Sequence, residues 1–494
     1  MTQQIIRLAH NAVHAKLLDA DPQLKREIAS MLSYRVAGAE HSDAFKGHRW
    51  DGRSSFFDFP TSTFPAGFVH PVHSFLVKKG YRVQLVRKAV PEPLGPSVKE
   101  CDATIDSFGG DPRYSYQVDT IERLERYGMM IARCATGAGK SRIARLAFAR
   151  IKRPTLFLTT RSVLMYQMAE SFENLDGRKV GILGDGDFTP RKGINCGMVQ
   201  TIAARLKNEA TREQMLNILS VFEMVILEEA HESGGNEYYE ILSACKNAHY
   251  RLALTATPFM RQDEEANMRL MAVAGPIGIE VTEEQLISSG ILATPYFKIV
   301  PTAPVPKVKR TSSWLRAYEY GIIKNEGRNG HIVFEVKRAT AMNLPAMVLI
   351  QRKEHGQILE KMMTAAGIRA KFIFGENSQD ERKKALKQLG NGELQCLIGS
   401  TILDVGVDVP SVGLVVLAGG GKAEVAHRQR IGRGLRAKKK GPNVALVVDF
   451  DDSINSHLKE HAVTRENILR TTPGFAERIL PPGADFDFKK LGLM

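Results

Sequence analysis

Two long stretches of the chain alternate short apolar runs with segments of helical periodicity. The first stretch, residues 112–290, has apolar runs that predict strands at 129–133, 155–159, 197–200, 223–227 and 250–255. The second stretch, residues 345–475, predicts strands near 346–350, 371–374, 395–399, 413–417 and 444–449. Strands that alternate with helices usually build a mostly parallel sheet. The pattern therefore predicts an α/β protein with two tandem domains of the same kind.

The segments around these stretches have other patterns. Residues 1–95 predict a small α/β domain, with a helix within 9–32, a strand at 56–59, a helix from Pro65 and a closing strand at 81–86. Prolines and glycines indicate a linker at 96–111, and prolines open a connector at 291–344. The C-terminal tail, residues 476–494, contains a Pro-Pro-Gly run at 481–483 and is expected to be loosely ordered.

Composition narrows the class of protein. The 494 residues are 43% hydrophobic and 25% charged, as in ordinary globular proteins. No apolar run approaches the roughly 20 residues that span a bilayer, and the N-terminus lacks a secretion signal. Five scattered cysteines favour a reducing, cytoplasmic setting. A net charge of +14 favours a polyanionic partner, nucleic acid above all, although a basic surface without such a role is the alternative.

One stretch of eight residues, 134–141, predicts a phosphate-binding loop. Its sequence, Cys-Ala-Thr-Gly-Ala-Gly-Lys-Ser, follows a predicted strand and precedes a predicted helix. Backbone N–H groups of such a loop converge on phosphate oxygens, and the helix N-terminus adds partial positive charge. We expect Lys140 to reach the β- and γ-phosphates of ATP and Ser141 to ligate Mg²⁺. The other predicted nucleotide contacts of the loop are Thr136, Gly137, Ala138 and Gly139.

Two further groups would complete a site for ATP hydrolysis. Glu228 and Glu229 end a predicted buried strand, where α/β sheets bind ligands. Glu228 is the candidate Mg²⁺ ligand, and Glu229 is the candidate base for the attacking water. Arg433 and Arg436, in the second domain, are candidate arginine fingers for the γ-phosphate, which would require the two domains to close.

The N-terminal domain carries a basic cluster with an aromatic residue. Arg49 and Arg53 flank Trp50, and such a set suits contact with a nucleic-acid backbone together with base stacking. The alternative is that Trp50 belongs to the core and the cations form a solvated face.

Residues 112–450 resemble superfamily 2 helicases or translocases of the DEAH-like kind, which have two RecA-like domains. The matching segments are Tyr114–Gln117, 134–141, Thr159–Ser162, Val199–Thr201, Glu228–His231, Thr255–Thr257, Gly399–Pro410 and Gln429–Arg436. The resemblance implies nucleotide contacts from Gln117, Gly406, Asp408 and Gln429, and strand contacts from Arg161, Gln200, Thr201, Ser400 and Thr401. Glu228 departs from the family, which usually has Asp there.

Within this superfamily the chain is most similar to UvsW-type phage helicases. This rests on the short N-terminal domain with Trp50-Asp51-Gly52 and Pro65–Phe68, and on Arg328-Asn329 in the connector. The resemblance implies unwinding or branch migration of forked and branched DNA by a monomer. Two alternatives remain: a double-stranded DNA translocase that does not separate strands, and a nucleic-acid-binding protein with a weakened ATPase. RNA as the substrate also stays open.

Overall fold

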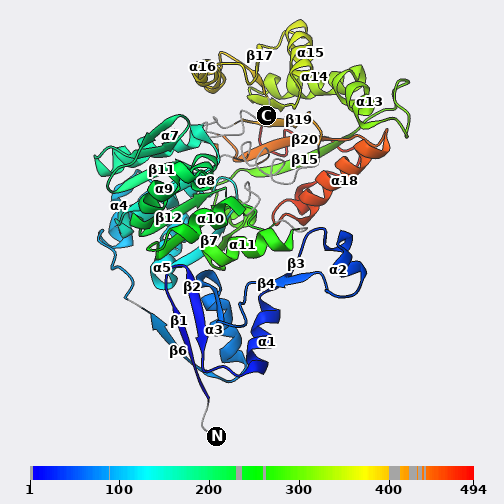
Figure 1. Ribbon diagram of the computed structural model, residues 1–494. Helices are drawn as coiled ribbons and strands as arrows, with labels where there is room; N and C mark the ends of the chain where they lie inside the picture. The colour runs from blue at the N-terminus through cyan, green and yellow to red at the C-terminus, as the bar shows by residue number, and fades with distance from the viewer. Residues whose placement is uncertain are drawn as a thin grey trace. The chain divides into compact units, whose positions relative to one another are not determined.

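The computed structural model describes residues 4–87, 89–229, 236–259, 263–399, 412–421, 431, 435, 437–438 and 441–493. The chain divides into two compact units (Figure 1). Unit 1 comprises Met1–Cys134 and Gly139–Val281, and unit 2 comprises Ala135–Ala138 and Thr282–Met494. Within the described residues, no helix is both long and apolar enough to cross a bilayer.

Unit 1 contains an eight-stranded sheet in the order β10-β9-β11-β8-β12-β13-β7-β14. Every neighbouring pair is parallel except β10 and β9. The strands are β7 (Met129–Cys134), β8 (Thr155–Thr159), β9 (Gly181–Gly184), β10 (Asp187–Thr189), β11 (Ile194–Met198), β12 (Met224–Glu228), β13 (Tyr250–Thr255) and β14 (Ile277–Val281). The five strands predicted here are confirmed, although the third begins three residues earlier than expected.

Helices cover both faces of this sheet because successive side chains of a buried strand point to opposite sides. Phe157 of β8 packs against Phe172 of α7, which contacts Phe148 of α6. Leu156 and Leu158, which flank Phe157 in β8, join a core with residues of α8, α9, α10 and α11 on the other face. The helices are α5 (Ser115–Tyr127), α6 (Lys140–Ile151), α7 (Ser162–Asp176), α8 (Val199–Lys207), α9 (Glu209–Val221), α10 (Asn236–Ala244) and α11 (Glu264–Ala274).

The N-terminal part of unit 1 has its own sheet, in the order β5-β2-β1-β6, with α1 and α3 beside it (Figure 1). Its elements are β1 (Ile5–His10), β2 (His14–Leu18), α1 (Pro22–Met31), β5 (Thr63–Pro65), α3 (Val69–Lys78) and β6 (Arg82–Arg87). A second ribbon pairs β3 (Ser33–Arg35) with β4 (Arg53–Ser55) and encloses α2 (Asp43–Lys46). The small α/β fold and the closing strand thus agree with the prediction.

Two expectations for this domain were wrong. Residues 9–21 do not begin a helix, because Ile6, Leu8, Ala15 and Leu17 are buried with the period of two of a β-hairpin. Residues 56–59 form a bend and an isolated bridge at Asp58 instead of a strand. Phe57 is buried there through contacts of its ring with Phe59 and Phe64.

The segment predicted as a linker, 96–111, contains helix α4 (Val98–Ile105). Ser97 caps the helix through a capping box with Glu100, which supplies a start signal directly after Pro96. Val98, Cys101 and Asp102 are buried, and Asp102 forms an ion pair with Arg142 of α6 at 2.7 Å. This segment is therefore a packed part of unit 1.

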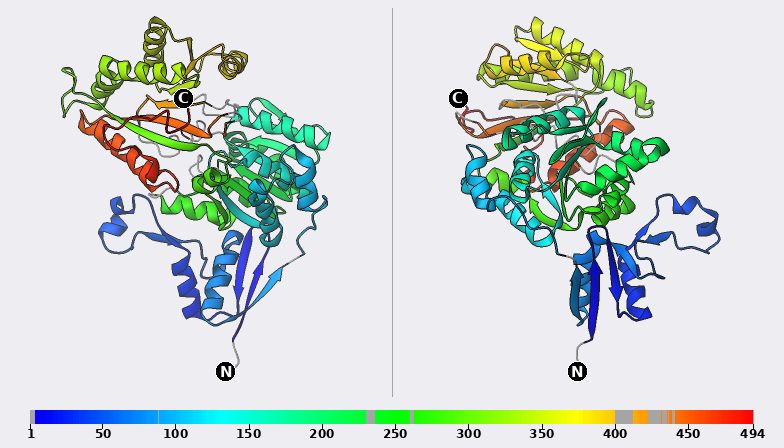
Figure 2. Two further views of the ribbon diagram at one scale, coloured as in Figure 1. Left: turned by 180° about the vertical axis from the view of Figure 1, so that it is seen from behind. Right: turned by 60° about the vertical axis from the view of Figure 1, so that its left-hand side comes forward.

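Unit 2 contains a six-stranded parallel sheet in the order β15-β20-β19-β16-β18-β17. Helices α14 and α15 lie over one face and α18 over the other (Figure 2). The elements are α12 (Glu283–Ser288), β15 (Thr294–Pro301), α13 (Trp314–Tyr318), α14 (Glu326–Ala341), β16 (Ala346–Leu349), α15 (Lys353–Ala365), β17 (Ala370–Ile373), α16 (Gln379–Gly390), β18 (Cys396–Gly399), β19 (Leu414–Leu417), β20 (Val444–Asp451) and α18 (Ser456–Thr471). The five predicted strands are confirmed.

Two flanking segments belong to the body of unit 2. The predicted connector 291–344 supplies β15 to the sheet and α14 to its cover. The tail was expected to be loosely ordered, but Phe486 and Phe488 are buried in the same core. Asp485 also accepts hydrogen bonds from Lys298 at 2.8 Å and from Arg338 at 2.6 Å. The aromatic side chains and this ion-pair cluster hold the tail in place.

Candidate functional site

The predicted phosphate-binding loop lies between β7, which ends at Cys134, and α6, which begins at Lys140. Gly137 and Gly139 have φ angles of 93° and 76°, a left-handed backbone that glycine adopts without strain. Lys140 and Ser141 therefore occupy the first turn of α6, where backbone N–H groups have no partner within the helix. This is the arrangement that a bound phosphate needs.

An acid pair lies at the carboxyl end of the sheet of unit 1. Glu228 is the last residue of β12, and only 6% of it is exposed. Glu229 follows with a φ of 49°, and its N–H donates to the carbonyl of Leu254 at 3.1 Å. The Lys140 ammonium lies 3.8 Å from Oε1 of Glu229. The structure thus brings together the loop lysine and the two predicted acids.

The carboxylate of Glu228 has the properties of a ligand for a cation. Within the described residues its Oε2 is buried and has no hydrogen-bond donor. Burial raises the pKa of Glu228 to about 7, with Lys140 acting in the opposite direction and Glu229 adding to the rise. A divalent cation would favour the ionised form and satisfy the buried oxygen, so the residues present fit Mg²⁺.

Gln117 lies in α5 and is fully buried beside the loop. A Cβ at Gly139 would lie 2.7 Å from its Nε2, so the amide group and the loop are in direct contact. The Oε1 atom of Gln117 accepts a hydrogen bond from Arg142 at 2.7 Å. Arg142 is held in turn by Asp102 at 2.7 Å and by Asp106 at 2.9 Å.

Sequence reasoning missed the residues that hold Gln117, which are Arg142, Asp102 and Asp106. Asp102 and Asp106 lie in the segment predicted as a linker, and Arg142 lies in the helix predicted after the loop. The available signal was the pair of acids four residues apart, which suits one face of a helix. The set fixes the position of Gln117 and so belongs to the candidate nucleotide site.

The candidate strand-binding residues of unit 1 come together at one edge of the sheet. Arg161 follows β8 and precedes α7, and Gln200 and Thr201 lie in the first turn of α8, after β11. Strands β8 and β11 are parallel neighbours, so their carboxyl ends meet. Gln200 donates from its side chain to the carbonyl of Thr160, next to Arg161, at 3.3 Å.

The N-terminal candidates have two different surroundings. Arg49 is exposed, and Trp50 is half-buried and donates from its indole to the carbonyl of Arg53 at 2.6 Å. The guanidinium group of Arg53 donates to the carbonyl of Ser33 and contacts Glu264 at 3.1 Å. Trp50 is therefore outside the core, while Arg53 ties the β3–β4 ribbon to α11.

Seven predicted site residues lie outside the described residues. They are Ser400, Thr401, Gly406, Asp408, Gln429, Arg433 and Arg436.

Two family models match this chain. The family described as type III restriction enzyme, res subunit, matches residues 112–260, and the helicase conserved C-terminal domain matches residues 332–438. The ATP-dependent DNA helicase uvsW of Enterobacteria phage T4 is 23% identical over 471 residues, which cover 90% of each chain. The putative helicase 22 of a Sulfolobus islandicus filamentous virus is 25% identical over 378 residues, 70% of this chain and 66% of that protein.

Solved structures show the same fold. The fragment structure of a putative HsdR subunit of a type I restriction enzyme from Vibrio vulnificus YJ016 matches with a TM-score of 0.56 and 20% identity. The match covers 77% of this chain and 70% of that one.

The two mostly parallel sheets, with a candidate phosphate-binding loop and an acid pair in the first, are those of a protein with two RecA-like domains. The chain belongs to the superfamily 2 helicases, and its activity is that of an ATP-dependent nucleic-acid helicase. It is of the UvsW type, since its similarity to the phage T4 helicase extends over nearly the full length of both chains.

Proposed function

We propose that the protein unwinds forked or branched DNA and drives branch migration, in recombination, repair or replication. The observation that carries this proposal is the match to the T4 DNA helicase over 90% of each chain. The part of this chain that the match leaves out is shorter than residues 1–95. The match therefore includes part of the N-terminal domain as well as the motor. We further propose that the protein acts as a monomer.

In the proposed reaction, each residue of the nucleotide site has a distinct role. The backbone of Thr136, Gly137, Ala138 and Gly139 binds the phosphates of ATP, and Lys140 supplies positive charge to them. Ser141 and Glu228 hold Mg²⁺, which when bound neutralises charge on the β- and γ-phosphates. Glu229 orients the attacking water and accepts its proton. The pair between Lys140 and Glu229 supports these roles, because both groups already converge at the loop.

Residues of the second domain complete the proposed site. Gln429, Gly406 and Asp408 contact the nucleotide, and Arg433 and Arg436 stabilise the charge that develops on the γ-phosphate. The match of the helicase C-terminal domain to residues 332–438 supports these assignments.

We propose that a nucleic-acid strand is gripped through its backbone. Arg161, Gln200 and Thr201 contact it in the first domain, and Ser400 and Thr401 contact it in the second. Contacts with phosphates and sugars give little sequence preference and a strong dependence on salt. The convergence of Arg161 and Gln200 at the ends of β8 and β11 supports this grip.

Strand displacement on matched substrates tests the proposal. The substrates are a fork, a four-way junction and a blunt duplex of one sequence, each in DNA and RNA versions, with Lys140→Ala as the inactive control. The proposal expects ATP-dependent displacement of DNA forks and junctions in preference to the blunt duplex. Equal rates on all three substrates, or a preference for RNA, would contradict it.

A second candidate function is translocation along duplex DNA without strand separation. It is favoured by the match of residues 112–260 to a family described as a restriction-enzyme subunit. Displacement of a triplex-forming strand from an intact duplex, with no displacement on the fork, would support this candidate over the first.

A further inference from the structure

A short basic turn in unit 2, residues 307–310, has the sequence Lys-Val-Lys-Arg and follows β15. Lys307, Lys309 and Arg310 are exposed. In the part of the chain that the structure describes, none of the three has a carboxylate within 4.0 Å. The turn therefore presents three uncompensated positive charges to solvent.

Buried side chains fix the backbone of the turn. The side-chain amide of Asn455, which is 1% exposed, lies 3.0 Å, 3.1 Å and 3.0 Å from the carbonyls of Lys309, Arg310 and Ser312. Val308 is buried against residues of α13 and α18. The backbone is thus fixed by buried groups while the cationic side chains face outward, so a ligand would not have to order the turn on binding.

Three cations, one of them from the turn, lie around the ring of Tyr320. The charged groups of Lys307, Arg316 and Lys324 lie 4.9 Å, 5.8 Å and 5.7 Å from the ring centroid of Tyr320. Lys324 is balanced by Glu319 at 2.7 Å and Glu354 at 3.2 Å. Lys307 and Arg316 both place positive charge near this ring, and a bound anion would be attracted to both.

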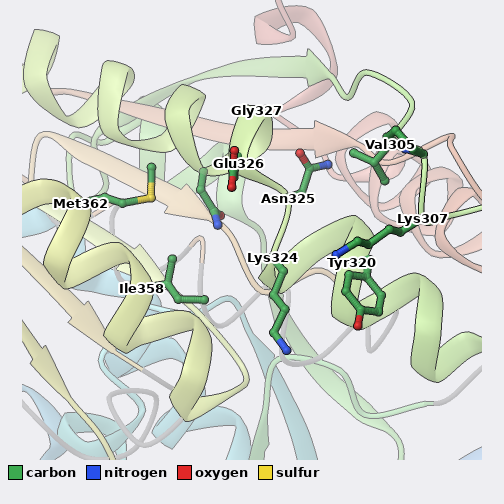
Figure 3. A pocket seen from close by; sticks show the side chains of 11 residues that line it. Val305, Lys307, Tyr320, Lys324, Asn325, Glu326, Gly327, Ile358 and Met362 are labelled. Atoms are coloured by element: carbon green, nitrogen blue, oxygen red, sulfur yellow. The ribbon is translucent and has the colours of Figure 1, made fainter.

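A cavity of about 640 Å³ opens next to these cations. Ile358 and Met362 form an apolar side of the cavity, and Val305, Lys307 and Tyr320 lie on the opposite side (Figure 3). Lys324 and the carboxylate of Glu326 also line it. A ligand that fits both sides combines an anion with a flat apolar group. A nucleotide of a single strand has both, whereas a duplex presents its phosphates and keeps its bases stacked and paired.

We propose that this turn and cavity form a binding site for single-stranded nucleic acid, apart from the motif segments by which the chain resembles superfamily 2 helicases. The phosphates contact Lys307, Lys309 and Arg310, and one unpaired base enters the cavity beside Tyr320. The inference rests on the proposed function in taking nucleic acid as the ligand. It adds a second point of contact to a strand that the motor holds elsewhere.

The test compares two triple variants of the full chain. Lys307→Ala/Lys309→Ala/Arg310→Ala removes the basic turn, and Lys361→Ala/Lys489→Ala/Lys490→Ala removes the same charge from other exposed positions of unit 2. Binding is measured without ATP by fluorescence anisotropy, with a labelled single strand and a blunt duplex. Three lost phosphate contacts reduce the salt slope by about 2, so the first variant should lose on the order of tenfold to a hundredfold in single-strand affinity at 0.1 M salt.

The control triple should stay within about twofold of the wild type, as should both variants on the blunt duplex. Tyr320→Phe should bind as the wild type, and Tyr320→Leu should lose single-strand affinity. Unchanged affinity of the first triple variant, an equal loss in both triples, or an equal loss on single strand and duplex would overturn the inference. A wild type that binds strands but fails to unwind forks would contradict the proposed function alone.

Discussion

The ammonium group of Lys140 lies 3.8 Å from Oε1 of Glu229, although 89 positions separate the two residues in the chain (229 − 140). Lys140 starts the helix after the phosphate-binding loop, and Glu229 follows the buried strand β12. Both side chains are largely buried, with 11% and 14% of their surfaces exposed. The parallel sheet of unit 1 is what brings this cation and this acid to one place.

The first prediction separates ATP binding from hydrolysis. Glu229→Gln keeps the size of the side chain but removes its ability to accept a proton. We expect it to lower the DNA-stimulated rate of ATP hydrolysis by roughly 10²- to 10⁴-fold while ATP binding is retained. Lys140→Ala should weaken binding itself. Steady-state ATPase assays and the affinity for a fluorescent ATP analogue give the two readouts, and equal loss of affinity in both variants would contradict the separate roles.

The second prediction concerns the hydrogen bond from Arg142 to Gln117 at 2.7 Å. Because Oε1 of Gln117 accepts this bond, its Nε2 group is held against the loop at Gly139. Arg142→Lys keeps the charge but loses the planar guanidinium that also contacts Asp102 and Asp106. We expect it to reduce the preference for ATP over GTP about fivefold, as Gln117→Ala should, since one hydrogen bond is worth about 1 kcal/mol. Unchanged preference in both variants would show that Gln117 does not select the base.

The third prediction tests the attachment of the N-terminal domain. A Cβ at Gly67 would lie 2.0 Å from the carbonyl oxygen of Met271 and 2.6 Å from that of Ala272, both of α11. These are backbone atoms that cannot turn away, so Gly67→Ala should destabilise unit 1 by about 1–3 kcal/mol. Gly330→Ala in unit 2 is the comparison, followed by Trp314 fluorescence in a Trp50→Phe background, because nothing lies within 4 Å of its Cβ and alanine favours the interior of α14.

The two tryptophans make this measurement specific. Trp50 lies in unit 1 and Trp314 in unit 2. In a Trp314→Phe background, urea unfolding followed by fluorescence therefore reports unit 1 alone. A Gly67→Ala protein as stable as its parent would show that the close packing on α11 does not exist in solution.

The packing of the N-terminal domain against α11 also limits how the role of residues 1–95 can be tested. Ala272 joins the apolar core of the N-terminal domain, with Met268, Met271 and Tyr239 packed against it. Removal of the domain would expose these side chains on the motor, so a deletion confounds function with stability. Point variants at Arg49 and Trp50, which lie outside that core, are the cleaner test of fork preference.

The fourth prediction is a pH dependence that originates in unit 2. His355 is fully buried, and burial, with a smaller effect from Arg328, lowers its pKa to about 3. The ordinary pKa of 6.5 applies in the unfolded chain, so the unfolded state binds the proton first as the pH falls. The stability of unit 2 should be complete above pH 6.5 and fall progressively towards pH 3. From pH 7 to pH 5 this group should remove roughly 2 kcal/mol.

His355→Gln removes the titration and supplies the comparison. The variant should show a smaller loss of stability between pH 7 and pH 5 than the wild type, measured by Trp314 fluorescence in a Trp50→Phe background. Parallel pH profiles for the two proteins would contradict the assignment to His355.

Much of the fold could be predicted because buried parallel strands are short apolar runs. The ten predicted strands of the two large sheets are present, and the loop at 134–141 and the acids at 228–229 lie where the strand order requires. The two β-strands before α1 were missed because Leu17, Leu24, Ile28 and Leu32 also fit a helical period over a longer window.

The missed parts depend on partners that are distant in the chain. Helix α4 lies between Pro96 and Gly109, and its packing is set by Asp102 and Arg142, which are 40 positions apart. The tail is held by Lys298 and Arg338, far from Asp485. Local patterns of proline and glycine correctly mark turns there, but they carry no information about what those turns bring together.

The most direct test of the central claim is ATP-dependent strand displacement on a DNA fork by the wild type and by Glu229→Gln. The account predicts that the wild type separates the fork and that the variant binds it without separating it. A variant that unwinds at the wild-type rate, or a wild type that hydrolyses ATP on DNA without displacing a strand, would contradict it.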